Sequence, residues 1–180
     1  MAIEQIRLRL LRATSVLKGA GIPYAVIGGN AVAEWVGRVD SGAVRFTKDV
    51  DILLNRNDLP RAIAVMDAAG FVYNETMGVH MFLDGPDSTP RDAVHLIFAE
   101  EKVREEYEYT APAVDAAEQA SEFQVVSLDA LVQMKLMSYR DKDKTHLRDM
   151  LDVGLVDANW PARLPPLLAE RLLNLIDNPE

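Results

Sequence analysis

The spacing of hydrophobic residues alternates between helical and extended patterns at the start of the chain. Residues 3–18 carry apolar side chains at helical spacing, and the "KGAGIP" that follows contains two glycines and a proline, which end helices. Residues 24–29, "YAVIGG", show the pattern of a short buried strand that ends in a tight turn. A second helical pattern, in residues 30–39, opens directly after the two glycines.

The alternation continues through the next strands. Residues 49–54, "DVDILL", predict a strand. The helix expected after it has Asp58 as its N-cap and Pro60 in its first turn. Residues 71–84 and 92–99 are further strand material, separated by the turn-rich "GPDSTPR". The order helix, strand, helix, strand, helix, strand, strand predicts an α+β fold, in which a small mixed sheet has flanking helices.

The pattern changes after this sheet. Residues 100–122 are polar and acidic, and we expect an exposed connection there. Ser127 is placed to cap a helix within residues 125–139, and two more helical patterns cover residues 141–156 and 164–176. The last third of the chain is therefore expected to be helical.

The length and composition fit one compact soluble unit. The chain has 180 residues, enough for one domain with a full core. We divide it into an α/β domain, residues 1–110, and a helical region packed on that domain, residues 111–180. No apolar run reaches the roughly 20 residues that cross a bilayer. Cysteine is absent, which excludes disulfides and thiolate metal sites and fits a cytoplasmic location. The net charge of −9 argues against strong sequence-independent binding of nucleic acid through its phosphates.

Asp49 and Asp51 are unusual in a strand that otherwise reads as buried. Residues i and i+2 of a strand point to the same face, about 6.5 Å apart along the backbone. Two such carboxylates repel each other unless a cation lies between them. Mg²⁺ binds a few carboxylates together with phosphate oxygens. The pair therefore predicts a divalent metal site that receives a nucleoside triphosphate.

Gly28 and Gly29 stand between the first strand and the second helix. Glycine allows close backbone approach, and a helix start offers free N–H groups to a phosphate. On its own, a glycine pair is more commonly just a turn. Asn30 follows the pair and could contact phosphate or cap the helix, and residue preferences favour the cap.

Together, "YAVIGGNAVAEW" and "TKDVDILL" resemble the nucleotidyltransferase superfamily, which has the fold of the DNA polymerase β palm. The Thr47 two residues before Asp49 matches a common feature of bacterial members. The later "LVQMKLMSYRDKDKTHLRDMLDV" is similar to a helical segment of toxins from abortive-infection and type IV toxin–antitoxin systems. The resemblance covers residues 24–54 and 125–153.

The resemblance implies transfer of a nucleoside monophosphate from an NTP to a hydroxyl of a small molecule, a tRNA or a protein. Mg²⁺ or Mn²⁺ would be held by Asp49 and Asp51. The expected nucleotide contacts are Gly28, Gly29, Asn30, Thr47, Lys48 and Lys135. Charge pattern alone favours a structural role for Lys135, on a solvated face or in an ion pair with Asp141, Asp143 or Asp149, and only the resemblance makes a phosphate contact an equal alternative.

One position departs from the pattern that the resemblance implies. The superfamily usually supplies a third carboxylate from a neighbouring strand, and the residue aligned with it here is His95. Imidazole can accept a proton near neutral pH, so His95 could serve as a general base or be purely structural. Asp92 lies three residues earlier and faces the other side of a regular strand. One strand register would bring His80 beside His95 as part of a transition-metal cluster, and a one-residue slip would separate them.

His95 leaves three functions open. The first is a metal-dependent nucleotidyltransferase. The second is a catalytically degenerate relative that binds a nucleotide or a partner such as an antitoxin. The third is a structural domain without a ligand.

Overall fold

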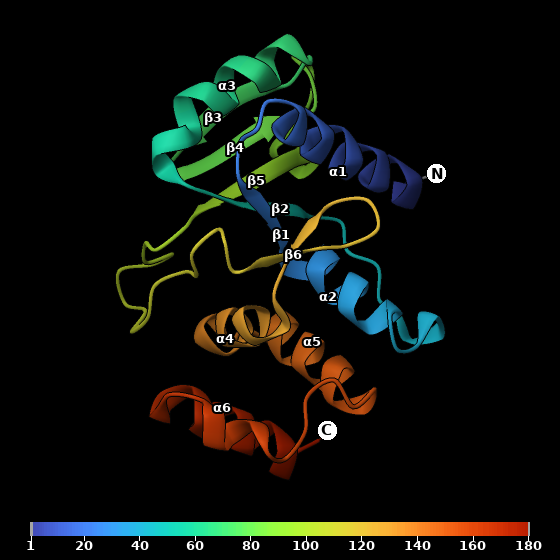
Figure 1. Cartoon of the computed structure of the whole chain (residues 1–180), viewed down its shortest axis with the longest axis vertical. Coiled ribbons are helices and arrows are strands. Elements are labelled where there is room, and N and C mark those ends of the chain that lie inside the picture. Colours follow the sequence, from blue (N-terminus) through green and yellow to red (C-terminus); the bar gives the residue numbers. More distant parts are fainter. Residues whose placement is uncertain (1, 180) are drawn as a thin grey trace.

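The computed structural model describes residues 2–179, and within them the chain forms six α-helices and one seven-stranded mixed sheet (Figure 1). This confirms the predicted α+β fold. The helices are α1 (Ala2–Gly19), α2 (Gly28–Gly37), α3 (Leu59–Ala68), α4 (Leu128–Ser138), α5 (Asp141–Asp152) and α6 (Pro166–Asp177). The strands are β1 (Tyr24–Ile27), β2 (Val50–Leu54), β3 (Val72–Thr76), β4 (Val79–Leu83), β5 (Ala93–Phe98), β6 (Ala117–Gln119) and β7 (Gln124–Val126), in the spatial order β3-β4-β5-β2-β1-β7-β6.

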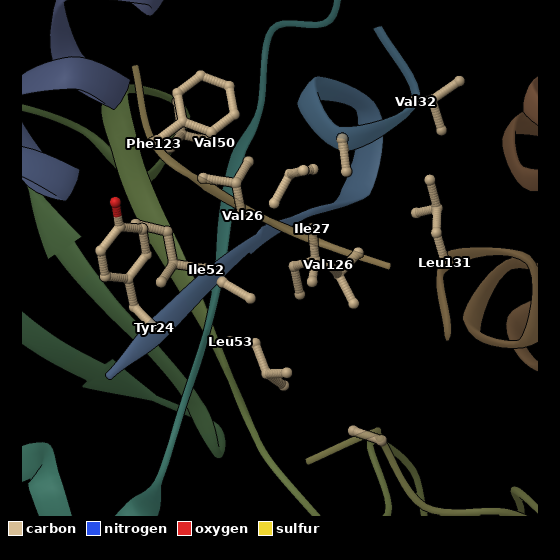
Figure 2. Packing of buried hydrophobic residues seen from close by; sticks show 14 of the residues in the cluster. Tyr24, Val26, Ile27, Val32, Val50, Ile52, Leu53, Phe123, Val126 and Leu131 are labelled. Atoms are coloured by element: carbon tan, nitrogen blue, oxygen red, sulfur yellow. The ribbon is translucent and has the colours of Figure 1, made fainter. Parts of the chain in front are cut away.

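The middle of the sheet is the core of the molecule. β2 lies between β1, with which it pairs antiparallel, and β5, with which it pairs parallel. Val26, Ile52 and Val94 on these three strands are fully buried. Figure 2 shows Val32 of α2 and Leu131 of α4 near the end of β1, so the first and last thirds of the chain meet around this strand.

The helix signals in the sequence are confirmed. α3 follows Asp58 and has Pro60 in its first turn, although the Asp58 side chain makes no capping hydrogen bond. The Oγ of Ser127 accepts a hydrogen bond from the N–H of Ala130 and caps α4. The helical character of the C-terminal third is also confirmed by α4, α5 and α6.

Residues 71–84 form a hairpin rather than one strand. β3 and β4 pair antiparallel around Met77 and Gly78, whose φ values of 53° and 76° are both positive, as in the two-residue turns that suit hairpins. β4 then pairs antiparallel with β5.

The expectation that residues 100–122 form only an exposed connection is wrong. Ala111, Val114 and Ala120 are buried, and β6 lies within this segment. β6 pairs with β7, which joins the sheet parallel to β1. The apolar residues of this stretch are isolated among acidic ones, so no periodic pattern reveals the strand. The sheet therefore extends beyond residue 110.

Figure 1 shows how the elements are distributed. α1 and α3 pack together at one end of the molecule, and α4, α5 and α6 lie at the other. No helix in residues 2–179 has both the length and the apolar character of a membrane span.

Candidate functional site

The sheet brings the glycine turn and both aspartates to one cavity. In the strand register, Asp51 lies opposite Ile27 of β1 on one side and His95 of β5 on the other. Gly28 directly follows β1, and Asp49 directly precedes β2. These residues line a cavity of about 440 Å³, and α4 and the start of α5 form its other wall.

Each glycine of the turn makes room for a particular side chain. Gly28 has a φ of +67°, and a Cβ placed there would lie 2.3 Å from Oδ2 of Asp51. A Cβ on Gly29 would lie 2.7 Å from the Cβ of Thr47. Real Cβ atoms do not approach other atoms this closely, so both positions exclude larger residues for a local reason. The turn and the Asp-x-Asp segment are thus packed against each other.

The two aspartates have opposite electrostatic environments. The Nζ of Lys142 donates a 2.6 Å hydrogen bond to Oδ2 of Asp49, and this contact lowers the pKa of Asp49. Burial raises the pKa of Asp51, and the charge of Asp49 adds to that effect, while the side chains of His95 and Lys135 oppose it. Asp49 is therefore the more readily ionised of the two, and a cation in the cavity would favour the ionised form of Asp51 as well.

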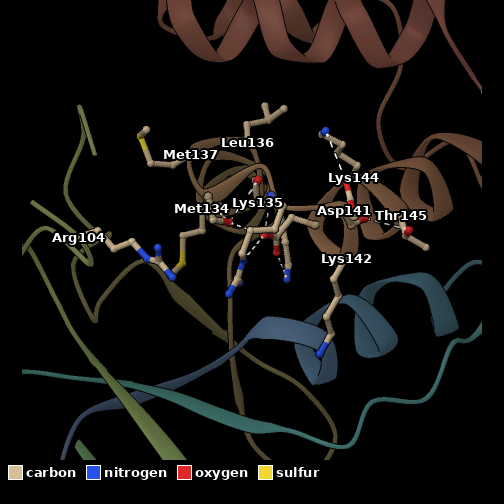
Figure 3. Close-up of polar contacts among 12 residues, drawn as sticks. Arg104, Met134, Lys135, Leu136, Met137, Asp141, Lys142, Lys144 and Thr145 are labelled. Carbon is tan, nitrogen blue, oxygen red and sulfur yellow. Dashed lines mark hydrogen bonds and ion pairs between the residues drawn. The ribbon is translucent and has the colours of Figure 1, made fainter. Parts of the chain in front are cut away.

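The wall formed by α4 and α5 is cationic. Lys135 is buried, lines the cavity and donates a 2.9 Å hydrogen bond to Oδ1 of Asp143. The ion pair that the charge pattern favours is therefore present, and the contact of Lys135 with a triphosphate stays a prediction. Arg140 and Lys142 line the same cavity. Figure 3 shows the Lys142 side chain directed toward α2 and the strands, whereas Lys144 lies on the other side of α5.

Three solved structures share this architecture, although the sequence itself matches no family model and no curated protein. The antibiotic-resistance factor ANT(2'')-Ia in solution is 13% identical, with a TM-score of 0.61, over 98% of this chain and 94% of the other. Its crystal structure in complex with adenylyl-2''-tobramycin is 16% identical, with a TM-score of 0.61, over 95% and 98%. An antigenic nucleotidyltransferase-like protein from Paracoccidioides brasiliensis is 17% identical, with a TM-score of 0.62, over 99% and 91%. The chain has the nucleotidyltransferase fold.

In this nucleotidyltransferase fold, the segment between β5 and β6 supplies cavity residues that the sequence analysis missed. Arg104, Tyr107 and Tyr109 all line the cavity. Figure 3 shows Arg104 extending from this segment toward Met134 of α4. The only signal in the sequence is the placement of one arginine and two tyrosines within the acidic "VREEYEY". The segment therefore closes one side of the site.

Two of the predicted nucleotide contacts, Asn30 and Thr47, form hydrogen bonds with the backbone of Asp49. Asn30 does not cap α2, because the helix already begins at Gly28 and Asn30 lies inside it. Its Nδ2 instead donates a 2.8 Å hydrogen bond to the backbone oxygen of Asp49, which ties α2 to the start of β2. Thr47 packs on Gly29, and its Oγ1 accepts a 3.3 Å hydrogen bond from the N–H of Asp49. Both residues hold the aspartate segment in place.

Lys48 is exposed and, like Asn30 and Thr47, is absent from the described cavity lining. The nucleotide-contact role of these three residues stays a prediction. Gly28, Gly29 and Lys135 do line the cavity.

The histidine alternatives are decided by the strand register. His80 pairs with Leu96 and faces away from His95, so the transition-metal cluster that would join these two histidines to Asp49 and Asp51 does not form. The Nδ1 of His80 lies 2.7 Å from the hydroxyl of Tyr73. Asp92 forms an ion pair with Arg9 of α1, away from the cavity, and so does not supply the third carboxylate that the resemblance implies.

The carboxylates present suit a metal ion that arrives with a nucleotide. Within residues 2–179, no group of three His, Asp or Glu side chains is arranged to hold a metal alone. Mg²⁺, however, commonly takes one or two carboxylates and completes its shell with waters and substrate phosphates. Asp49 and Asp51 fit that requirement, provided that the cation replaces the ammonium of Lys142 beside Asp49.

A larger hollow of about 660 Å³ lies at the opposite end of β1, beside Tyr24 and Gln124. It contains neither the glycine turn nor either aspartate of the β2 segment. We therefore place the candidate site at the smaller cavity, where chemically active groups converge.

Proposed function

We propose that the protein transfers a nucleoside monophosphate from an NTP to a hydroxyl acceptor, with Mg²⁺ or Mn²⁺. The observation that supports this most strongly is the contact between the Asp51 carboxylate and Gly28 at the start of α2. That contact places an anionic metal ligand directly beside helix N–H groups that suit a phosphate. The nucleotidyltransferase fold of the chain agrees with this reading.

Different residues around the cavity would bind the metal ion and the phosphates. Asp49 and Asp51 would hold the divalent ion, which when bound supplies charge neutralisation at the phosphoryl group and the leaving pyrophosphate. The backbone of Gly28 and Gly29 would contact the triphosphate. Lys135 and Arg140 would balance its remaining negative charge from the opposite wall.

In the proposed reaction, a bond forms between the acceptor oxygen and the α-phosphorus, and the bond from that phosphorus to pyrophosphate breaks. The proton of the attacking hydroxyl passes to His95, which lies opposite Asp51 on the neighbouring strand. An imidazole thus takes the place that the family resemblance gives to a carboxylate.

A small molecule is the acceptor that we favour. ANT(2'')-Ia, which aligns over nearly the whole of both chains, has been observed with an adenylylated tobramycin. The net charge of −9 disfavours a long nucleic acid. A tRNA or a protein side chain as acceptor would be revealed by the experiment below.

His95 also supports a second candidate function. A chain that lacks the third carboxylate could bind nucleotide without transferring it and act through a partner, in the manner of a toxin with its antitoxin. Under this alternative, the cavity binds a metal–nucleotide complex and releases it unchanged.

A transfer assay tests the proposal. Each NTP, labelled at the α-phosphate, is incubated with the protein, Mg²⁺ or Mn²⁺ and cell extract, and label is followed in the small-molecule, tRNA and protein fractions. We expect transfer that falls at least about 100-fold in Asp51→Asn, since one of the two groups that hold the cation is then neutral. Asp87→Asn is the control, because Asp87 is exposed and lies outside the cavity lining.

Equal transfer by Asp51→Asn and the wild-type protein would contradict the metal role of Asp51. Stabilisation by nucleotide without any transfer would favour the degenerate relative.

A further inference from the structure

Asp143 is the most enclosed charged group beside the cavity. Its side chain is 1% exposed. Oδ1 accepts the 2.9 Å hydrogen bond from Nζ of Lys135. Oδ2 accepts hydrogen bonds from Oγ of Ser138 at 2.8 Å, from Nε of Arg140 at 2.8 Å and from the N–H of Arg140 at 3.2 Å. One carboxylate thus joins the end of α4 to the beginning of α5.

These contacts outweigh the cost of burial. Burial alone would raise the pKa of the Asp143 carboxyl, but the hydrogen bond from Arg140 and the charge of Lys135 lower it to about 2. Asp143 is therefore ionised at neutral pH. It fixes two long side chains that would otherwise sample many rotamers.

Both cationic partners of Asp143 line the cavity that contains Asp49 and Asp51. Lys135 belongs to α4, and Arg140 immediately precedes α5. Their common anchor determines where the two cations lie relative to each other and to the aspartates. Preorganised charges of this kind stabilise a bound anion without reorganising at the moment of binding.

We propose that Asp143 is a positioning residue for the triphosphate, acting through Lys135 and Arg140. The inference rests on the function proposed above. It assigns the α4–α5 junction as the place where the phosphate-binding cations are held at fixed positions relative to each other. Asp143 itself does not touch the nucleotide, because its oxygens are occupied by Lys135, Ser138 and Arg140.

The charge of Asp143 makes this proposal distinguishable from a simple electrostatic effect. An anion near a triphosphate repels it, so removing the charge alone would tighten nucleotide binding. If Asp143 instead orients the two cations, removing its charge weakens binding although the cavity becomes more positive.

The test is calorimetric titration of the full chain with α,β-methylene-ATP and Mn²⁺. Asp143→Asn keeps the size of the side chain and an oxygen that can accept the N–H of Arg140, which retains the cap of α5. We expect the affinity for the nucleotide to fall about tenfold, which is the loss expected when one charge-assisted hydrogen bond is weakened. Asp141→Asn is the matched control, because Asp141 carries the same charge on the first turn of α5 but is fully exposed. Binding by Asp143→Asn that equals or exceeds that of the wild-type protein overturns the inference.

A double-mutant cycle separates positioning from general stability. If Asp143 acts through Lys135, adding Asp143→Asn to Lys135→Met costs less affinity than it does in the wild-type background. Fully additive losses overturn that route. Should Asp143→Asn fail to fold, Ser138→Ala removes one hydrogen bond from the carboxylate and leaves every charge in place. It should weaken binding about threefold, and unchanged binding would overturn the inference.

The two proposals fail in different ways. Wild-type protein that binds no nucleotide with Mn²⁺ overturns the proposed function and the inference together. Wild-type binding with an unaffected Asp143→Asn overturns the inference alone.

Discussion

Gly28 and Asp51 illustrate how much of the candidate site can be predicted from the sequence before the structure is known. The i, i+2 spacing predicts that both carboxylates lie on one face of a strand. The resemblance to nucleotidyltransferases implies that the glycine turn belongs to the same site. The sequence does not predict that the Asp51 carboxylate occupies the space a Cβ on Gly28 would need, because that depends on the pairing of β1 with β2. Asn30 shows the same limit: local preference predicts a helix cap, but the tertiary hydrogen bond to Asp49 decides where its side chain lies.

Gly28→Ala tests the contact between Gly28 and Asp51, and Gly21→Ala is its control. Both glycines have positive φ, at +67° and +65°, but a Cβ on Gly21 has no atom within 4 Å. We expect Gly21→Ala to lower the free energy of unfolding by about 1 kcal/mol through backbone strain alone. Gly28→Ala should cost at least about 1 kcal/mol more and turn Asp51 out of place.

The measurement is urea unfolding of both variants, followed by nucleotide titration with Mn²⁺. Gly28→Ala should lose nucleotide binding, and Gly21→Ala should keep it. Equal losses of stability, with binding retained in both, would show that Asp51 does not depend on Gly28.

At the scale of elements, the sequence predicts best where a regular pattern meets a clear stop signal. The helices and strands of residues 2–70 and the helices α4, α5 and α6 are all recognisable in this way. β6 and β7 are only three residues long, too short for alternation to be visible. The cavity residues between β5 and β6 were missed because an acidic run usually indicates a solvated segment.

α5 provides an element-level prediction through His146. This histidine is 3% exposed, and Nδ1 has no hydrogen-bond partner among the described residues. Burial lowers the pKa of His146 to about 4, from 6.5, with further lowering from Lys135 and Lys142 and opposition from Asp143 and Asp149. Below pH 6.5 His146 binds a proton in the unfolded chain, whereas in the folded chain it stays neutral until about pH 4. Stability therefore falls as pH falls across this window.

We expect His146→Leu to remove that dependence. Between pH 7 and pH 4 the wild-type protein should lose about 3 kcal/mol more unfolding free energy than the variant, from the linkage of one buried histidine. Urea denaturation of both proteins at several pH values measures the difference. Parallel stability–pH curves would mean that His146 is protonated equally in the folded and unfolded states.

At the scale of the whole molecule, the site is a property of the assembled sheet. Residues from β1, β2 and β5 meet at one cavity, and α4, α5 and the segment after β5 close it with cations and aromatic rings. The resemblance in the sequence covers the strand–turn–helix and Asp-x-Asp parts, and the shared fold extends over nearly the whole chain. Three-dimensional likeness persists at 13–17% identity because many sequences satisfy the same packing pattern.

We propose above that Asp49 and Asp51, beside the Gly28–Gly29 turn, bind a cation that carries a triphosphate. The most direct measurement is anomalous diffraction from crystals of the protein with Mn²⁺ and α,β-methylene-ATP. We predict a manganese peak about 2 Å from carboxylate oxygens of both aspartates, with the Lys142 ammonium displaced from Asp49 and the triphosphate against the glycine turn. A nucleotide bound elsewhere, or a manganese peak that touches neither aspartate, would contradict the account.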